Sequence, residues 1–169
     1  MPTNPAAVRT KRYALPTKKY IALAMRYFFK TQLKWGLIPL ALILINAVLN
    51  LTGVYPNLWI YITVFVGALL YVLFWLVQFT GITQLAQYKP MFEKFSYEID
   101  NRQILMKLNQ KEGSVMKWEQ IMDAYKDKEA YVLVISKGQF LYLPFSIFTS
   151  EHDVKVFERI MKQKEFLKA

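Results

Sequence analysis

Few side chains in this sequence have the types and spacing that catalysis needs. The only histidine is His152, and there is no cysteine, so thiol chemistry and disulfides are excluded. A single histidine also lacks the partners that a metal site requires. No nucleophile elbow, glycine-rich phosphate loop or metal-binding motif is present. We therefore predict a protein that is not an enzyme and that binds no cofactor or metal ion. A membrane enzyme of an unfamiliar type is the alternative.

Three carboxylates come closest to an arrangement that could transfer protons. Glu119, Asp123 and Asp127 are spaced by four residues, which would align them on one face of a helix and also on one face of a strand. Lysine residues interleave with them, and this mixture is typical of a charged edge in contact with solvent. We interpret this region as a surface that binds a partner protein. The candidate partner contacts are Lys126, Lys128 and Lys137.

The elements that must position these residues follow a long apolar block. Between Trp35 and Tyr88 there is no Lys, Arg, Asp, Glu or His. A transmembrane helix needs about 20 apolar residues, so the block has room for two. The stretch Asn50–Asn57 (NLTGVYPN) favours a turn, because it contains glycine, proline and asparagine. We predict a first transmembrane helix over 35–51, a short non-cytoplasmic loop over 52–57 and a second transmembrane helix over 58–79.

Basic charge is concentrated before this block. The first 34 residues contain eight of the 22 Lys and Arg residues and no acidic residue, whereas the residues after Tyr88 contain 14 basic and 12 acidic residues. The predicted loop has no basic residue. Because Lys and Arg favour the cytoplasmic side of a membrane, both termini are predicted to be cytoplasmic. The membrane also accounts for the charge without a nucleic-acid partner, for which no motif is present.

Residues 17–34 have the pattern of a basic amphipathic helix. At about 100° per residue, cations fall on one side of the helix and apolar residues on the other. We interpret it as a helix lying in the headgroup layer, after a flexible basic arm over residues 1–16. A helix that packs on the C-terminal domain is the alternative. The candidate contacts with the membrane surface, including interfacial aromatic residues, are Lys18, Lys19, Arg26, Lys30, Lys34, Trp35, Tyr55 and Trp59.

Residues 89–169 change from helical to alternating periodicity. About five strands are predicted, over residues 91–100, 102–109, 115–125, 131–136 and 139–144. The last two are apolar on both faces, which indicates central strands. Residues 150–168 are predicted to form a helix, with Ser150 as its N-cap and Asp153 as the capping-box partner. The pattern predicts a small antiparallel sheet covered by a C-terminal helix.

The order of features in this region resembles a known family. Trp118 is predicted as a core residue, and Pro144 is predicted to end the last strand, because proline has no N–H to donate. The segment Trp118–Ile121 (WEQI), an apolar strand, then Leu143-Pro144 and Phe148 before a closing helix follow one another. With the two preceding spans, this order resembles the YcxB-like family of bacterial membrane proteins. The resemblance implies a multi-pass protein of the bacterial cytoplasmic membrane whose cytoplasmic domain is pleckstrin-homology-like.

Three functions agree with this membrane α + β architecture. The first is a non-enzymatic membrane protein that presents its cytoplasmic domain for protein interaction, as an accessory subunit or scaffold of a membrane complex. The second is an immunity, resistance or envelope-stress protein against membrane-acting toxins, and this alternative rests on analogy alone. The third is recognition of anionic lipid headgroups through Lys89, Lys94, Lys107 and Lys111. The expected partners are the bilayer and its anionic headgroups, and either another membrane protein or a second copy of the chain.

Overall fold

The computed structural model describes residues 7–32, 34–55, 57–109 and 112–167. The chain divides into two units, one formed by residues 1–20 together with 86–169 and the other by residues 21–85. We call the described parts of the first unit the β domain, and residues 21–85 the helical unit. Lys111, a candidate lipid contact, lies outside the described residues, as do residues 1–6 of the predicted arm.

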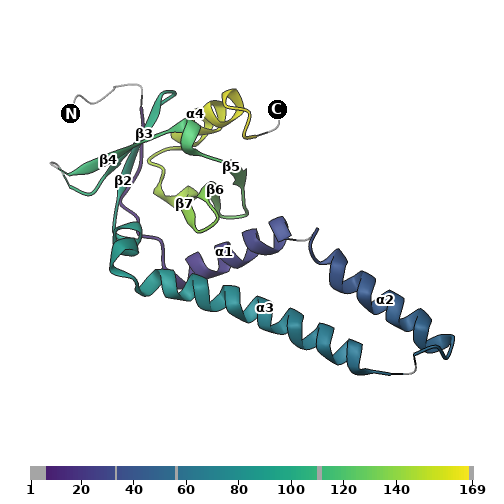
Figure 1. Cartoon of the computed structure of the whole chain (residues 1–169). Helices are drawn as coiled ribbons and strands as arrows, with labels where there is room; N and C mark the ends of the chain where they lie inside the picture. The colour runs from purple at the N-terminus through teal and green to yellow at the C-terminus, as the bar shows by residue number, and fades with distance from the viewer. Residues whose placement is uncertain (1–6, 33, 56, 110–111, 168–169) are drawn as a thin grey trace. The chain divides into compact units, whose positions relative to one another are not determined.

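The described part of the β domain contains seven strands in two antiparallel sheets (Figure 1). The four-stranded sheet has the order β1-β2-β3-β4, formed by Val8–Arg9, Ser96–Ile99, Gln103–Lys107 and Gly113–Lys117. The three-stranded sheet has the order β5-β6-β7, formed by Asp123–Lys126, Ala130–Ser136 and Gln139–Pro144. β7 ends at Pro144, as the sequence predicts.

Strand β1 differs from the flexible arm that the sequence predicts. Val8 pairs with Ile99 and Arg9 pairs with Glu98, so the arm adds a strand to the edge of the sheet. The Thr10 backbone N–H continues the pairing by donating to the Tyr97 carbonyl at 3.0 Å. The arm is ordered here because Val8 is buried in the core cluster and its backbone groups find partners on β2.

One of the predicted strands is shortened in the structure, and another is divided. Within residues 91–100, only Ser96–Ile99 is strand, because the 3-10 helix η1 (Ala86–Phe92) occupies the start and contains Pro90. Within residues 115–125, the 3-10 turn η2 (Trp118–Gln120) separates β4 from β5, which belong to different sheets. The strand count is therefore higher than the sequence pattern indicates.

The core of the β domain lies between the sheets and the C-terminal helix α4 (Glu151–Gln163). Ser150 caps this helix as predicted, since its Oγ accepts a hydrogen bond from the Asp153 backbone N–H at 3.1 Å. Phe157 of α4 is fully buried and packs against Tyr131, with ring centroids 4.9 Å apart. Trp118 is a core residue, as predicted, and its Nε1–H donates to the Asp100 carbonyl at 2.8 Å.

The helical unit contains most of α1 (Thr17–Gln32), then α2 (Leu37–Leu51) and α3 (Trp59–Gln84). α3 has 26 residues and is long and apolar enough to cross a membrane, and it contains the predicted span 58–79 almost entirely. α2 has 15 residues, which is short of that length, and it qualifies only when it is taken together with α1. The described residues thus contain one candidate span, or two if the bent α1–α2 pair counts as one.

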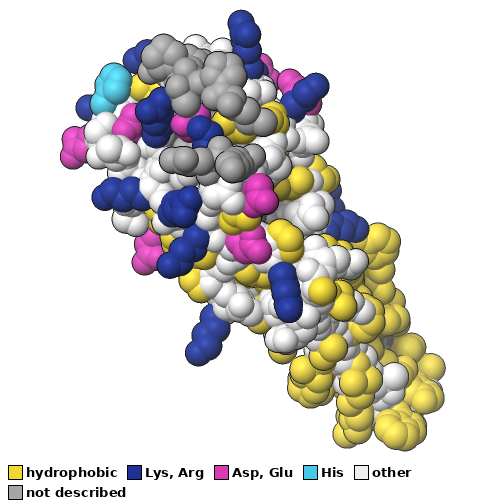
Figure 2. All heavy atoms as spheres, turned by 90° about the vertical axis from the view of Figure 1, so that its left-hand side faces the viewer, with side chains coloured by type: hydrophobic (Ala, Val, Ile, Leu, Met, Phe, Trp, Pro, Cys, Tyr) yellow, Lys and Arg dark blue, Asp and Glu magenta, His cyan; other side chains and the backbone are white. Residues whose placement is uncertain are grey.

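The large apolar side chains of α2 and α3 are mostly exposed. Hydrophobic side chains cover the visible surface of this part of the chain in Figure 2, whereas the basic and acidic side chains gather on the β domain. Some packing exists inside the unit, where Phe28 of α1 lies against Trp75 of α3 with ring centroids 5.2 Å apart. Such a surface is typical of helices that are surrounded by hydrocarbon.

Candidate functional site

The β domain contains a cavity of about 310 Å³ between its two sheets. Strands of both sheets, the segment after β1 and the 3-10 helix η1 all contribute to it. Its size is at the lower end of the range that small-molecule sites have. The lining residues are Tyr13, Leu15, Gln87, Tyr88, Pro90, Met91, Phe95, Tyr97, Met106, Ser114, Met116, Ile135, Gln139, Phe140, Leu141 and Tyr142.

One side of the cavity is a continuous face of the four-stranded sheet. Tyr97 on β2 is opposite Met106 on β3, and Met106 is opposite Ser114 on β4. Directly paired residues share a face of an antiparallel sheet, so these three side chains form one row across the strands. The alternation of β4 places Met116 on the same face and Val115 on the other face, where Val115 is 45% exposed.

The opposite side comes from the β6–β7 hairpin and from the segment that follows β1. Tyr142 on β7 faces Tyr13, and their ring centroids are 6.0 Å apart. Tyr13 is held by backbone hydrogen bonds with Phe95, in which the Tyr13 N–H donates to the Phe95 carbonyl at 2.8 Å and the Phe95 N–H donates to the Tyr13 carbonyl at 3.0 Å. The segment before the helices therefore completes a site that is otherwise built from residues after them.

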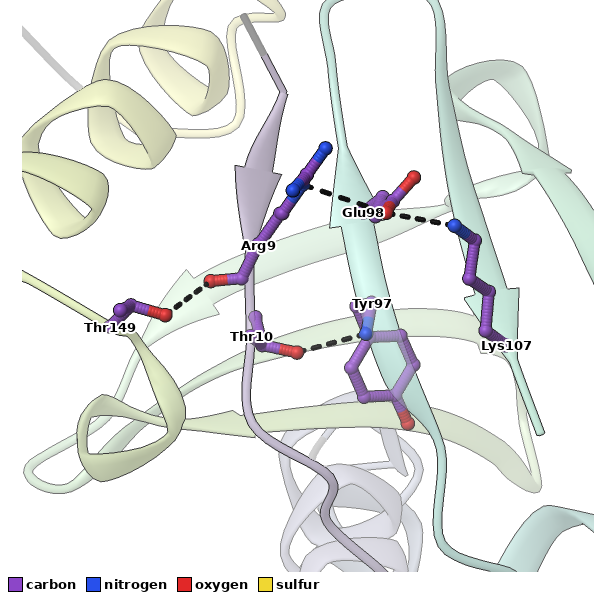
Figure 3. Close-up of polar contacts among 6 residues, drawn as sticks. All are labelled: Arg9, Thr10, Tyr97, Glu98, Lys107 and Thr149. Carbon is purple, nitrogen blue, oxygen red and sulfur yellow. Dashed lines mark hydrogen bonds and ion pairs between the residues drawn. The ribbon is translucent and has the colours of Figure 1, made fainter. Parts of the chain in front are cut away.

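Strand β1, which positions Tyr13, is bound through polar contacts on both sides (Figure 3). The Tyr97 backbone N–H donates to the Thr10 Oγ1 at 2.9 Å, and the Thr149 hydroxyl donates to the Arg9 carbonyl at 3.1 Å. The Glu98 carboxylate lies between Arg9 and Lys107, at 3.6 Å from the Arg9 Nε and 2.8 Å from the Lys107 Nζ. Lys107, a candidate lipid contact, is therefore paired within the sheet.

The lining of the cavity is uncharged but contains hydrogen-bonding groups. It holds no Lys, Arg, His, Asp or Glu side chain among the described residues. Burial raises the pKa of Tyr97 to about 12 and also raises the pKa of Tyr13. Both hydroxyls therefore stay protonated and neutral at physiological pH. Among the described lining residues, the hydrogen-bonding side chains are therefore those of neutral tyrosine, serine and glutamine residues.

The first turn of α1 packs against the β domain beside this cavity. Tyr20 is fully buried, its hydroxyl donates to the Gly138 carbonyl at 2.8 Å, and its ring meets Phe92 edge to face at 5.3 Å. The Lys19 Nζ lies 2.7 Å from Glu129 and 5.1 Å from the centre of the Tyr142 ring. The Glu129 carboxylate, the main cause, raises the pKa of Lys19. The first turn of α1 therefore packs on the C-terminal domain, as in the alternative stated above for residues 17–34.

The other predicted membrane-surface residues are exposed. These residues are Lys18, Arg26, Lys30, Lys34, Trp35, Tyr55 and Trp59. Lys19 is partly buried, and its ammonium group binds Glu129. Contact of the exposed cations and aromatic residues with headgroups stays a prediction, whereas Lys19 is paired inside the β domain.

The predicted partner contacts do not form one cluster. The Lys126 Nζ lies 2.7 Å from the Glu158 carboxylate of α4 and 5.5 Å from the centre of the Phe145 ring. Lys128 precedes β6 and Lys137 follows it, so seven strand residues separate them, about 23 Å at 3.3 Å per residue. Lys128 and Lys137 are exposed, and Lys126 mainly connects β5 to α4.

The residues with catalytic potential are not brought together. Glu119 lies in η2, Asp123 begins β5 and Asp127 follows β5. His152 is exposed in the first turn of α4. In the part of the chain that the structure describes, no group of three or more His, Cys, Asp or Glu side chains is placed to hold a metal ion.

The cavity was not predicted from the sequence. Its four tyrosine residues are scattered from Tyr13 to Tyr142 and belong to four separate segments. The one available signal is the high number of tyrosines, eleven in 169 residues, together with methionines in the strands. That composition does not indicate which side chains meet.

Comparison with known proteins supports the resemblance for part of the chain. A family model described as YcxB-like protein matches residues 99–161, from the end of β2 to the last turn of α4. The match confirms the predicted resemblance over these residues, which are less than half of the chain. No curated protein and no solved structure matches the chain.

Proposed function

We propose that this chain, which matches the YcxB-like family over residues 99–161, is a non-enzymatic integral membrane protein that presents its β domain in the cytoplasm for protein interaction. In this role it would be an accessory subunit or scaffold of a membrane complex. One observation carries the proposal: the apolar helices are inserted between two paired strands of the same sheet. The domain is therefore attached to the helices through both β1 and β2.

This insertion supports a hairpin with two membrane crossings. β1 precedes the helices and β2 follows them, yet the two strands are paired. A chain that leaves and re-enters one sheet must cross the bilayer an even number of times. If α3 crosses once, a second crossing is needed, and the uncharged residues 35–52 around α2 are the segment available for it. At 1.5 Å per residue the 15 residues of α2 span about 22 Å, so the turn residues on either side would have to complete a crossing of about 30 Å.

The charge distribution supports a cytoplasmic position for the β domain. Eight basic residues and no acidic residue precede the helices, and the turn between α2 and α3 contains no basic residue. The positive-inside preference then favours the cytoplasm for both termini. The seven strands and closing helix of the described β domain also agree with the strand number of a pleckstrin-homology-like domain.

An edge of the β domain has the features of a partner surface. β4 is an edge strand of the four-stranded sheet, so its outer backbone groups have no strand partner in the described sheet. Val115 on β4 and Met122 just before β5 are 45% and 67% exposed. Elsewhere in the described β domain, the large apolar side chains are at least partly covered. We propose this edge, rather than the lysines singled out above, as the contact with another membrane protein or a second copy.

Site-specific photo-crosslinking in the native membrane tests this function. A photoreactive residue at Val115 or Met122 should give one adduct of defined mass, and a matched residue at Ser146, which is exposed elsewhere on the β domain, should give none. Mass spectrometry of the adduct then distinguishes a second copy from another membrane protein. Equal crosslinking at Ser146, or no adduct at Val115 and Met122, would contradict the proposed surface.

A further inference from the structure

We propose that the cavity of the β domain binds the apolar chain of an uncharged lipid, whose hydroxyl or ester group accepts or donates hydrogen bonds at the tyrosine hydroxyls. The bilayer that holds the helices is the source of this lipid, and in this respect the inference rests on the proposed membrane anchoring. The chemistry of the site rests only on residues of the β domain.

The size of the cavity limits the ligand to a chain of moderate length. A volume of 310 Å³ holds roughly ten water-sized groups at about 30 Å³ each. This is the space that one medium-length acyl chain, or the end of a longer one, needs. Met91, Met106 and Met116 line the space, and their flexible thioether side chains can adapt to a mobile chain.

The charge of the site selects against ionised ligands. None of the described lining residues is charged. Lys19 contacts Tyr142 from outside the lining, but Glu129 lies 2.7 Å from its ammonium group and balances it. A buried ionised headgroup would find no counter-ion in the cavity and would lose its hydration. A neutral alcohol or ester does not incur this cost.

Tyr97 gives the site a hydrogen-bonding group. Its side chain lines the cavity and the residue is only 6% exposed. Burial, followed by the neighbouring Tyr13, raises the pKa of Tyr97, so its hydroxyl stays protonated and can donate a hydrogen bond. An oxygen of a bound lipid would be a suitable acceptor.

The segment that follows α3 in the chain lines part of the cavity. The 3-10 helix η1 contributes Gln87, Tyr88, Pro90 and Met91 to the lining. It begins at Ala86, two residues after α3 ends at Gln84. If α3 lies in the bilayer, the segment that follows it directly in the chain therefore forms part of the site.

Photolabelling of the full chain in phosphatidylcholine nanodiscs tests this inference. Three probes would carry the same ten-carbon chain with a diazirine and differ only in the head: decanoylglycerol, decyl sulfate and decyltrimethylammonium. The neutral probe should label peptides that contain Met91, Met106 or Met116 at least about tenfold more than either charged probe, because a buried charge costs more than 1.4 kcal/mol. Preferential labelling by the sulfate would overturn the inference in favour of an anionic headgroup site.

Matched variants connect the labelling to the cavity. Ser114→Phe places a large side chain on the cavity face of β4 and should abolish labelling of these peptides, whereas Ser146→Phe makes the same change at an exposed position outside the lining and should leave the labelling unchanged. Tyr97→Phe should weaken neutral-probe binding roughly two- to tenfold, the effect of one hydrogen bond. Labelling that persists in Ser114→Phe would show that the probe binds elsewhere.

The readouts separate this inference from the proposed function. The photo-crosslinks at Met122 report the partner surface and do not involve the cavity. Loss of cavity labelling with an intact Met122 adduct would overturn the lipid site alone. Cavity labelling without any adduct would support the lipid site and contradict the partner surface.

Discussion

The β domain and the helical unit place their large apolar side chains in opposite ways. In the β domain, aromatic and aliphatic residues such as Trp118, Phe157 and Leu133 are almost fully buried. In α2 and α3, residues such as Leu44, Leu70 and Phe74 are mostly exposed. Both units consist of regular helices or strands, so the difference in side-chain exposure reflects what each unit is suited to be surrounded by. One unit forms its own core in water, and the other is suited to hydrocarbon, in which exposed apolar surface carries no cost.

The comparison can be tested with the same substitution in both units. Trp118→Ala removes a 2%-exposed side chain and its hydrogen bond to Asp100, so it should lower the stability of the β domain by about 3–5 kcal/mol. Trp59→Ala, at a 64%-exposed position, should leave that stability within about 0.5 kcal/mol. Hydrogen exchange of the β3 and β6 amides in the full chain measures both. Similar effects of the two variants would remove the contrast.

Introducing a charged side chain into each unit tests what surrounds that unit. Leu70, near the middle of α3, and Val115 of β4 are both exposed, at 59% and 45%. Leu70→Arg should disfavour membrane insertion by roughly 2.5–3.5 kcal/mol, whereas Val115→Arg should be tolerated because it faces water. The fraction of protein that resists alkaline extraction from membranes is the measurement. Normal insertion of Leu70→Arg would indicate that α3 does not lie in the bilayer.

The closing helix of the β domain offers a smaller effect. Ser150→Ala removes the side-chain acceptor for the Asp153 N–H and should lower stability by about 1 kcal/mol. Ser146→Ala, an exposed position outside the helix, serves as the control and should have little effect. Thermal unfolding followed in parallel for the two variants measures the difference. A larger loss in the control would show that the cap does not stabilise α4.

The smallest expected effect depends on pH. The hydrogen bond from Lys126, followed by that from Tyr131, lowers the pKa of Glu158 below its usual 4.5. A carboxylate with a lowered folded-state pKa stabilises the fold above the unfolded value, and this stabilisation is lost as the pH falls through the folded value. Glu158→Gln should therefore cost less than about 1 kcal/mol at pH 7, and the cost should shrink below pH 4.5. Urea unfolding at both pH values measures it, and a cost independent of pH would contradict this role.

The sequence indicates regular elements best where the local pattern is strong. The alternation and apolarity of residues 131–144 predict the β6–β7 hairpin, and Ser150 with Asp153 predicts the start of α4. The uncharged block, interrupted by the turn residues 50–57, predicts two apolar helices, and α2 and α3 lie there.

Features that depend on distant contacts could not be predicted in this way. β1 consists of Val8 and Arg9, which have no periodicity, and its partner strand lies about 90 residues later in the chain. Residues 115–125 are predicted as one strand, and their pattern does not reveal the 3-10 turn that the Ile121 N–H to Trp118 carbonyl hydrogen bond defines. The cavity combines side chains from both sheets and from both sides of the helices, and no local pattern reports that combination.

Labelling of single cysteines most directly tests the central claim that the helices cross the membrane and hold the β domain in the cytoplasm. The chain has no cysteine, so Thr52→Cys in the turn and Ser146→Cys in the β domain would each be the only reactive thiol. If the helices cross the membrane in this way, a membrane-impermeant maleimide should label Thr52→Cys on intact spheroplasts and should label Ser146→Cys only after permeabilisation. Labelling of Ser146→Cys on intact spheroplasts, or protection of Thr52→Cys until permeabilisation, would contradict it.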